Sequence, residues 1–320
     1  MATSAKHVIG VDLGGTNIQV GVVNEKNRIV GRSKSKTQAD KGTETVIDRI
    51  VKTVNDAIDD SKLKPSEISG LGIGAPGTVD VKKGIVRTAV NLRWNNFPLC
   101  KHLTKKLKMP VTLDNDVNVG TWGEFVAGAA KTKKGDLLGI FVGTGIGGGL
   151  VLNGQLYSGD MGTAGEIGHV VLHADGILGR RTLENAASRT NIVRQITDLI
   201  RANHESSIGE ATDDNLDNIR SKALAEALAK NDPLTTEIVK NAATYVGIAI
   251  ANTVTLLSLS NVVVGGGMVE AAGGTFVEWV RESFVANVFP PDLKKCNIMA
   301  SKLGDDAGVI GAADLARERL

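Results

Sequence analysis

The sequence predicts an α/β protein with two lobes and an active site in the cleft between them. Two observations lead to this fold class. The chain has 320 residues, whereas single domains mostly contain about 100–200. A strand, a glycine-rich turn and a return strand occur twice, at residues 8–23 and 137–152. This repeat indicates a duplicated unit with a nucleotide held between the two copies.

The first copy centres on the turn Asp12-Leu13-Gly14-Gly15-Thr16-Asn17 between apolar, β-branched residues, which predicts a hairpin. In a dinucleotide fold or a P-loop the glycines lead into a helix, and a P-loop also ends in Gly-Lys-Ser/Thr. Here an anion would instead meet turn amides and the Thr16 hydroxyl, with a cation held by Asp12. This stretch alone is also compatible with an ordinary glycine-rich hairpin.

Composition narrows the class of function. The net charge of +2 gives no reason to expect nucleic acid or an anionic membrane as a partner, so small-molecule chemistry is favoured. Cys100 and Cys296 are too few for a disulfide framework. The first strand begins within a few residues of the N-terminus, which leaves no room for a signal peptide. We therefore expect a cytoplasmic protein.

One uncharged segment, Val246 to Val264, is about long enough to cross a bilayer. Its Asn, Thr and Ser residues, and the strand-like Asn261-Val262-Val263-Val264 at its end, favour a buried helix that runs into a buried parallel strand.

The elements of the first half follow from periodicity and turn residues. A third strand is expected from Ile29 to Lys34, and a helix from Thr43 to Asp60 covers the sheet with its apolar face. The strand Gly70 to Gly74 leads into a loop that contains Gly77, and a loop at the C-terminal end of a strand is a common ligand contact. Gly72, Gly74 and Gly77 fit G-x-G-x-x-G, but no helix follows, so a dinucleotide site is disfavoured.

The densest polar cluster follows the strand Val111 to Leu113. A short basic helix after Pro98 precedes this strand, and a helix that carries Trp122 follows it. Between them stand Asp114-Asn115-Asp116-Val117-Asn118, although a helix N-cap needs only one such residue. Because Asp116 lies at a helix N-terminus, we expect its ionised form to be favoured.

The second half repeats the opening pattern. Leu137 to Val142 is a strand, the turn contains Thr144 and Gly145, and Leu150 to Leu152 returns. The triglycine Gly265-Gly266-Gly267 follows another strand and would let the backbone approach an adenosine. Helices are expected from Thr275 to Val288 and, built on small residues, from about Gly304 onward, where the lobes meet.

These motifs together resemble the actin-like ATPase superfamily, with its ribonuclease H-like fold, and within it the ROK family of sugar kinases and repressors, nearest to its glucokinases. The resemblance covers nearly the whole chain. It rests on residues 12–17, 72–80, 115–118, 143–149, 165–169 and 265–267. It implies a small lobe of residues 1–118 plus 303–320 and a large lobe of residues 119–302.

The resemblance also implies site residues. The base that faces the sugar hydroxyl is Asp116. The sugar contacts are Gly77, Asn115, Asp116, Glu166, His169 and Glu184. The positions for ATP are Asp12, Gly14, Gly15, Thr16, Asn17, Thr144, Gly145, Gly265, Gly266 and Gly267, with Mg²⁺ beside Asp12 through the nucleotide or a water.

The chain departs from the family pattern at two places. Asp114 stands where family glucokinases often have Glu. Residues 174–183 are shorter than the Cys-x-Cys-Gly-x-x-Gly-Cys zinc element of many members and contain no cysteine, so we expect no zinc.

The expected activity is ATP-dependent phosphorylation of glucose to glucose 6-phosphate by a homodimer. Fructose, mannose, N-acetylmannosamine and allose are alternative substrates, and a sugar sensor without turnover is an alternative function. A repressor of the family would need a helix-turn-helix before the first hairpin, and only seven residues precede Val8.

Overall fold

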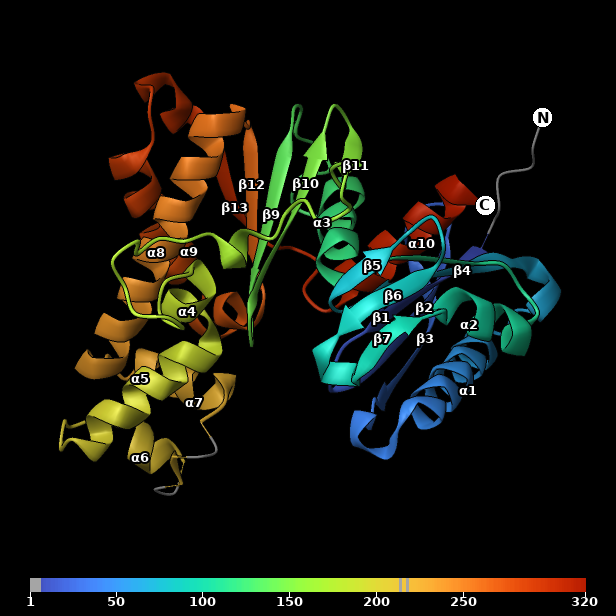
Figure 1. The fold of residues 1–320 in the computed structure, drawn as a ribbon, viewed down its shortest axis with the longest axis horizontal. Helices are drawn as coiled ribbons and strands as arrows, with labels where there is room; N and C mark the ends of the chain where they lie inside the picture. The colour runs from blue at the N-terminus through green and yellow to red at the C-terminus, as the bar shows by residue number, and fades with distance from the viewer. Residues whose placement is uncertain (1–6, 213–214, 217–218) are drawn as a thin grey trace.

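The computed structural model describes residues 7–212, 215–216 and 219–320. It has two lobes, one on each side of a central pair of helices, α3 (Asp116–Val126) and α10 (Asp306–Arg319) (Figure 1). In this described part of the chain, no helix is both long and apolar enough to cross a membrane. The expectation about a module before Val8 falls mainly on residues 1–6, outside the described part.

The first lobe contains a five-stranded sheet in the order β3-β2-β1-β4-β8. The strands β1, β2 and β3 form an antiparallel meander, and β4 and β8 extend the sheet in parallel from β1. Their bounds are β1 His7–Leu13, β2 Asn17–Asn24, β3 Ile29–Lys36, β4 Ile68–Ala75 and β8 Val111–Asn115. The meander and the first hairpin are thus confirmed, and the third strand runs two residues beyond its expected end.

The second lobe contains a sheet of the same topology, β11-β10-β9-β12-β13. Here too a three-stranded meander is extended by two parallel strands. The bounds are β9 Leu137–Val142, β10 Ile146–Leu152, β11 Gln155–Tyr157, β12 Asn261–Gly265 and β13 Asn297–Ala300. The duplication inferred from the two glycine-rich turns is therefore confirmed at the level of topology.

Helices cover both sheets, and a small antiparallel sheet joins the first lobe. The small sheet consists of β5 Thr78–Asp80, β6 Ile85–Ala89 and β7 Trp94–Phe97. The remaining α-helices are α1 Thr43–Ser61, α2 Leu99–Leu107, α4 Leu183–Ala187, α5 Arg189–Arg201, α6 Ile208–Ala211, α7 Ser221–Ala229, α8 Pro233–Leu257 and α9 Gly267–Asn287.

Helix periodicity explains how these elements bury their apolar faces. In α1, Val46, Ile47, Ile50 and Val54 are fully buried in the core of the first lobe, as their spacing predicts. The uncharged segment from Val246 is the second half of α8, which buries one face, and it leads into the buried strand β12. The end of the helix is not buried, since Leu256 is 82% exposed and Leu257 is 38% exposed.

Small residues bring α10 into direct contact with its neighbours. A Cβ added at Gly10 or Gly72 would lie 1.8 or 1.9 Å from a carbonyl oxygen of α10, and one at Gly311 would lie 1.8 Å from the Val119 oxygen of α3. Because α3 also packs on β9 and β10, α10 and α3 connect the two sheets. The expectation that a small-residue C-terminal helix packs at the junction is confirmed.

One helix boundary differs from the prediction. The helix expected from Thr275 to Val288 begins eight residues earlier, at Gly267. Gly266 has a φ of 88°, which turns the chain from β12 directly into α9, and Gly273 (φ 62°) kinks this helix. The weak helix propensity of the glycines hid the first turns of α9.

Candidate active site

The two glycine-rich turns connect β1 to β2 and β9 to β10, at equivalent positions of the two sheets. In the first, the Gly14 amide donates to the Asn17 oxygen at 2.9 Å and closes the turn between β1 and β2, which places Asp12 near the end of β1. In the second, the Gly143 amide donates to the Gly145 oxygen at 2.9 Å between β9 and β10. The two sheets therefore present equivalent hairpins.

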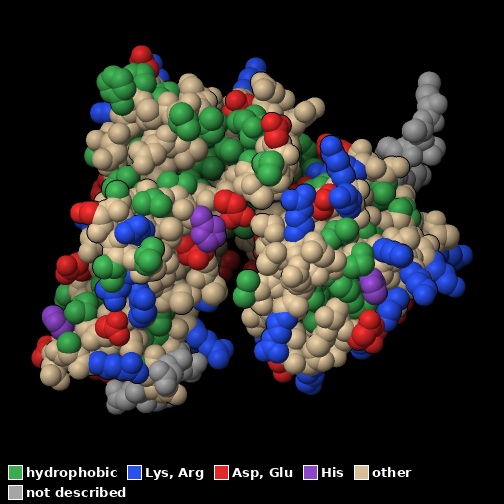
Figure 2. Space-filling view, viewed as in Figure 1, with side chains coloured by type: hydrophobic (Ala, Val, Ile, Leu, Met, Phe, Trp, Pro, Cys, Tyr) green, Lys and Arg blue, Asp and Glu red, His purple; other side chains and the backbone are tan. Residues whose placement is uncertain are grey.

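An acidic cavity lies between the lobes, where Figure 2 shows the molecule hollowed. It contains two of the predicted site carboxylates, Asp12 and Asp116, and two of the predicted glycines, Gly266 and Gly267. The other lining residues are Val117, Gly120, Phe141, Glu270, Gly304, Asp305, Ala307 and Gly308. The N-terminal end of α10 closes over Asp12, since a Cβ at Gly308 would lie 2.9 Å from the carboxyl carbon of Asp12.

Both predicted carboxylates in this cavity have raised pKa values. Burial, together with the negative charges of Asp116 and Asp305, raises the pKa of Asp12 to about 7, against the opposing effect of Lys34. Burial, together with the charge of Glu166, raises the pKa of Asp116 to about 6. The expected effect of the helix start is present, because the Val117 amide lowers the Asp116 pKa, but burial outweighs it.

The polar residues at the start of α3 have different roles. Asn115 is the N-cap, and its side-chain oxygen accepts from the amides of Val117 and Asn118 at 2.9 and 3.1 Å. Asp114 is buried and accepts from the Asn118 side chain at 3.0 Å and from Arg319 of α10 at 2.7 Å. Asp116 is left as the carboxylate that faces the cavity.

A second cavity begins on the other side of Val117, which lines both. Gly77, Asn115 and Glu166 line it, and the Asn115 side chain donates to the Gly77 oxygen at 2.9 Å. Gly77 has a φ of 83°, and a Cβ there would lie 2.0 Å from the Thr88 oxygen, so a glycine is required.

This cavity continues into a hollow lined by Gly77, Glu166, His169 and Glu184. His169 and Glu166 lie at the 3₁₀ turn Ile167–His169, and the His169 ring nitrogen is 3.9 Å from the Glu166 carboxylate. Glu184, in α4, accepts from the Ile146 amide of the second hairpin at 2.8 Å. Five of the six predicted sugar residues therefore lie around two adjoining cavities, and the sixth, Asp116, lines the acidic cavity.

The structure does not bring every predicted nucleotide residue to these cavities. Asp12, Gly266 and Gly267 line the acidic cavity, whereas Gly14, Gly15, Thr16, Asn17, Thr144, Gly145 and Gly265 line none of the three described above. Gly145 still lies beside the sugar residues, because a Cβ there would be 2.3 Å from the Glu184 carboxylate.

Sequence reasoning missed several polar residues of this region. Asp305 and Glu270 line the acidic cavity, and Arg189 contacts Thr144. Asp305 stood in a stretch read only as the start of a helix built on small residues. The adjacent carboxylates Asp305 and Asp306 are the feature of the sequence that distinguishes this segment from a plain run of small residues.

No group of three His, Cys, Asp or Glu side chains suited to a metal ion occurs among residues 7–212, 215–216 and 219–320. His173 packs edge-on against Tyr245 with ring centroids 5.1 Å apart, so its ring has a structural contact.

The ROK family profile matches residues 8–319. The chain belongs to the ROK family.

Among ROK relatives, the glucokinase of Halalkalibacterium halodurans is 33% identical over 99% of this chain and 96% of its own length. The xylose repressor of Caldicellulosiruptor bescii is 28% identical, and the match covers 95% of this chain and 76% of the repressor. A crystal structure of a ROK glucokinase from Streptomyces griseus, in complex with glucose and AMPPNP, has a TM-score of 0.86 and 32% identity over 98% of this chain and 99% of that one. The two-lobed actin-like fold is thus shown.

Proposed function

We propose that this protein is a hexokinase of glucokinase type, which transfers the γ-phosphoryl group of ATP to glucose and forms glucose 6-phosphate and ADP. The observation that carries the proposal is that Val117 lines two cavities and that its neighbour Asp116 lines one of them, the acidic cavity. The acidic cavity also contains Gly266 and Gly267, and the other cavity contains Glu166 and Asn115. The similarity to glucokinases over nearly the whole chain supports the same activity.

In the proposed reaction, the 6-hydroxyl oxygen of glucose bonds to the γ-phosphorus while the bond from that phosphorus to the β,γ-bridging oxygen breaks. The hydroxyl proton passes to the Asp116 carboxylate. One Asp116 oxygen accepts from the Val117 amide at 2.9 Å, which fixes the orientation of the carboxylate and leaves the other oxygen for the hydroxyl. Because the transition state for phosphoryl transfer is loose, the protein contributes mainly positioning and electrostatic stabilisation.

The proposed sugar contacts include two carboxylates, those of Glu184 and Glu166. Glu184 is fixed by the Ile146 amide and still has acceptor capacity for sugar hydroxyls, while Glu166 and His169 lie beside it. Asn115 donates from its side chain to the Gly77 oxygen, and its side chain also hydrogen-bonds Asp116. These groups together offer acceptors and a donor to one face of a hexose.

The carboxylates of the acidic cavity also fit a magnesium ion that enters with the nucleotide. The carboxylates of Asp12 and Asp116 repel each other in a buried cavity, and hard oxygen ligands of this kind suit Mg²⁺. We propose that Asp12 holds the ion through the nucleotide or a water. When bound, it would neutralise charge on the phosphates of ATP.

A coupled assay of ADP release tests the activity and its specificity. Glucose, mannose, fructose, N-acetylmannosamine and allose are compared at saturating MgATP, and polyphosphate replaces ATP in a parallel series. We expect the highest kcat/KM with glucose and ATP. Turnover of another sugar with glucose inactive would reassign the substrate, and sugar binding without any turnover would indicate a sensor.

Asp116→Asn tests the base. We expect its kcat to fall by roughly 10²–10⁴-fold, while the Kd for glucose changes less than threefold, because the amide keeps the shape of the side chain but accepts no proton. Asp292→Asn, at a position with a 90% exposed side chain, is the matched control and should keep full activity. An Asp116→Asn variant that kept more than about a tenth of the wild-type kcat would show that another group takes the proton.

We also propose that the protein is a homodimer located in the cytoplasm, as expected from the sequence. Light scattering after size-exclusion chromatography measures the first property, and fractionation of cells measures the second.

A further inference from the structure

Arg189 is the first residue of α5 and contacts the second hairpin with both its backbone and its side chain. Its amide donates to the Gly143 oxygen at 2.9 Å, and one terminal nitrogen of its guanidinium lies 3.1 Å from the Thr144 hydroxyl. The other terminal nitrogen donates to the Ser221 hydroxyl at 3.0 Å. The guanidinium is thus held between the tip of the hairpin and the start of α7.

Among residues 7–212, 215–216 and 219–320, no carboxylate neutralises the charge of this guanidinium. Both side-chain partners, Thr144 and Ser221, are neutral hydroxyls, and within the described part of the chain no carboxylate forms an ion pair with Arg189. A guanidinium has five N–H donors, so several remain for another acceptor. An arginine in this state is well suited to an anionic ligand that binds between the lobes.

The contact with Arg189 also directs the Thr144 hydroxyl. A hydroxyl has one donor and two acceptor sites, and here the oxygen accepts from Arg189. Its own proton is therefore left to be donated elsewhere. Arg189 and Thr144 together offer a positive charge and a hydroxyl donor side by side, which is the combination that binds a phosphate oxygen.

These residues lie next to Gly266 and Gly267, which line the acidic cavity. A Cβ at Gly267 would be 3.4 Å from the Ser221 hydroxyl, and one at Gly266 would be 2.7 Å from the Val142 oxygen, one residue before the hairpin tip. Arg189 therefore stands on the same side of the cleft as the proposed adenosine position.

We propose that Arg189 binds the phosphate tail of the nucleotide directly, alongside the Thr144 hydroxyl. The inference rests on the proposed function, because it takes the anion at this hairpin to be the phosphoryl donor or its product. It adds a cationic donor ligand from α5, outside the two glycine-rich turns. The ligand is a nucleoside di- or triphosphate. Arg189 contacts its phosphates, and binding of the nucleoside part does not depend on Arg189.

Calorimetric titration of MgADP, MgATP and adenosine into wild-type and Arg189→Met protein, without sugar, tests this inference. We expect Arg189→Met to weaken MgADP and MgATP by roughly 10–100-fold, since a hydrogen bond to a charged group is lost. Adenosine, which has no phosphate, should bind within twofold of wild type. Arg189→Lys should recover part of the loss because it keeps the charge.

Thr190→Val is the matched control. It removes the other side-chain contact from α5 to the hairpin, in which the Thr190 hydroxyl donates to the Thr144 oxygen at 2.7 Å, without changing charge. We expect it to leave MgADP binding within threefold of wild type. If Arg189→Met is poorly folded by its melting temperature, Arg189→Gln carries the same expectation.

Two outcomes would overturn the inference. An equal loss of adenosine and ADP affinity in Arg189→Met would mean that the side chain only supports α7 and the hairpin. Unchanged MgADP affinity would mean that the guanidinium does not reach the phosphates. Neither outcome depends on sugar turnover, so a wild-type protein that binds MgADP but phosphorylates no hexose would refute the proposed function and leave this test in force.

Discussion

At the scale of a single residue, Asp116 must be ionised to act as a base, although it is buried in the cleft. A base must be ionised at working pH, yet its burial in the cleft raises its pKa to about 6. The amide of Val117 lowers the pKa and keeps it below neutrality. A base with a pKa just below the working pH is ionised and still has appreciable proton affinity.

The pKa of Asp116 predicts an acid limit to activity. Its folded-state pKa is raised, so the carboxylate is protonated as pH falls through about 6, and the protonated form accepts no proton. We expect kcat/KM for glucose, measured from pH 5 to 9 at saturating MgATP, to fall below about pH 6. Glu166→Gln removes a negative charge that raises this pKa, so its acid limit should move to lower pH even as its KM rises. An acid limit that stayed in place or moved upward would argue against Asp116 as the titrating group.

At the scale of elements, α10 depends on glycine at the positions where backbones touch. Gly311→Ala would bring a methyl group to 1.8 Å from the Val119 oxygen, and the backbone of α3 cannot give way as a flexible side chain could. We expect a loss of roughly 1–3 kcal/mol or more in the free energy of unfolding, measured by urea denaturation.

The matched control is Gly274→Ala in α9, where no atom outside the helix lies within 4 Å of the added Cβ. Alanine is a better helix former than glycine, so this variant should be neutral or gain up to about 1 kcal/mol. If both variants lost similar stability, close packing of α10 would not be the cause.

The loop between His169 and α4 lies where the sequence resemblance places the cysteine-containing zinc element of many ROK members. We predict that it binds no zinc, because His169 and His173 supply only two nitrogens and this segment contains no cysteine. Elemental analysis should find well under one zinc per chain. EDTA followed by excess Mg²⁺ should leave activity and melting temperature unchanged. Stoichiometric zinc would contradict this reading, as would a large fall in thermal stability after His169→Gln.

At the scale of the whole molecule, the sequence was informative wherever local signals and tertiary structure agreed. Turn chemistry and β-branched flanks located both hairpins, and the repeat predicted a duplicated unit, which the two sheets of one topology confirm. It was not informative where a contact joins distant segments. Nothing near Asp114 in the chain shows that Arg319 pairs with it at 2.7 Å, 205 residues away. The same holds for Arg189, whose partner Thr144 lies 45 residues earlier.

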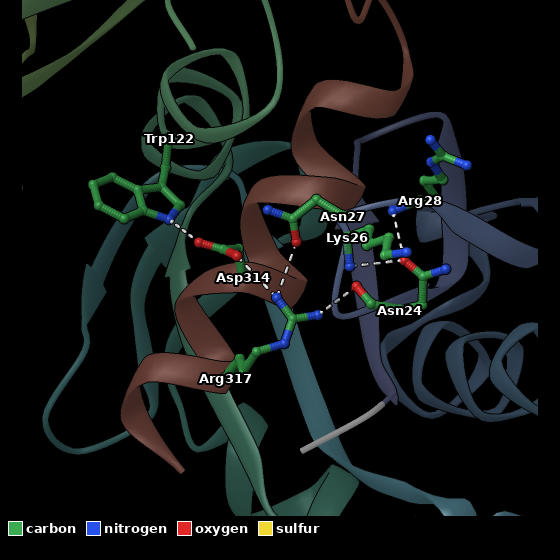
Figure 3. A network of polar contacts seen from close by, with 7 residues as sticks. All are labelled: Asn24, Lys26, Asn27, Arg28, Trp122, Asp314 and Arg317. Carbon is green, nitrogen blue, oxygen red and sulfur yellow. Dashed lines mark hydrogen bonds and ion pairs between the residues drawn. The ribbon is translucent and has the colours of Figure 1, made fainter. Parts of the chain in front are cut away.

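A long-range network of this kind connects the two lobes through α10 (Figure 3). Asp314 accepts from the Trp122 indole of α3 at 3.0 Å and from Arg317 at 2.9 Å. Arg317 also donates to the backbone oxygen of Asn24 and to the side chain of Asn27, in the turn between β2 and β3. One carboxylate thus links a helix on the second sheet with a turn of the first.

Removal of this carboxylate should therefore weaken the whole molecule. Asp314 and Arg317 have side chains only 15% exposed, so Asp314→Ala leaves the Trp122 indole N–H without its acceptor and the shielded guanidinium without its charged partner. We expect the melting temperature to fall by roughly 3–5 °C for a loss of about 2–3 kcal/mol. Trp122→Phe keeps an aromatic ring in place and loses one neutral hydrogen bond, so its fall in melting temperature should be less than half as large.

Because neither side chain lines the proposed cavities, kcat at 25 °C should stay within threefold of wild type in both variants. An Asp314→Ala protein as stable as wild type, by scanning calorimetry, would show that the lobes are held together by the packing of α3 against α10 alone.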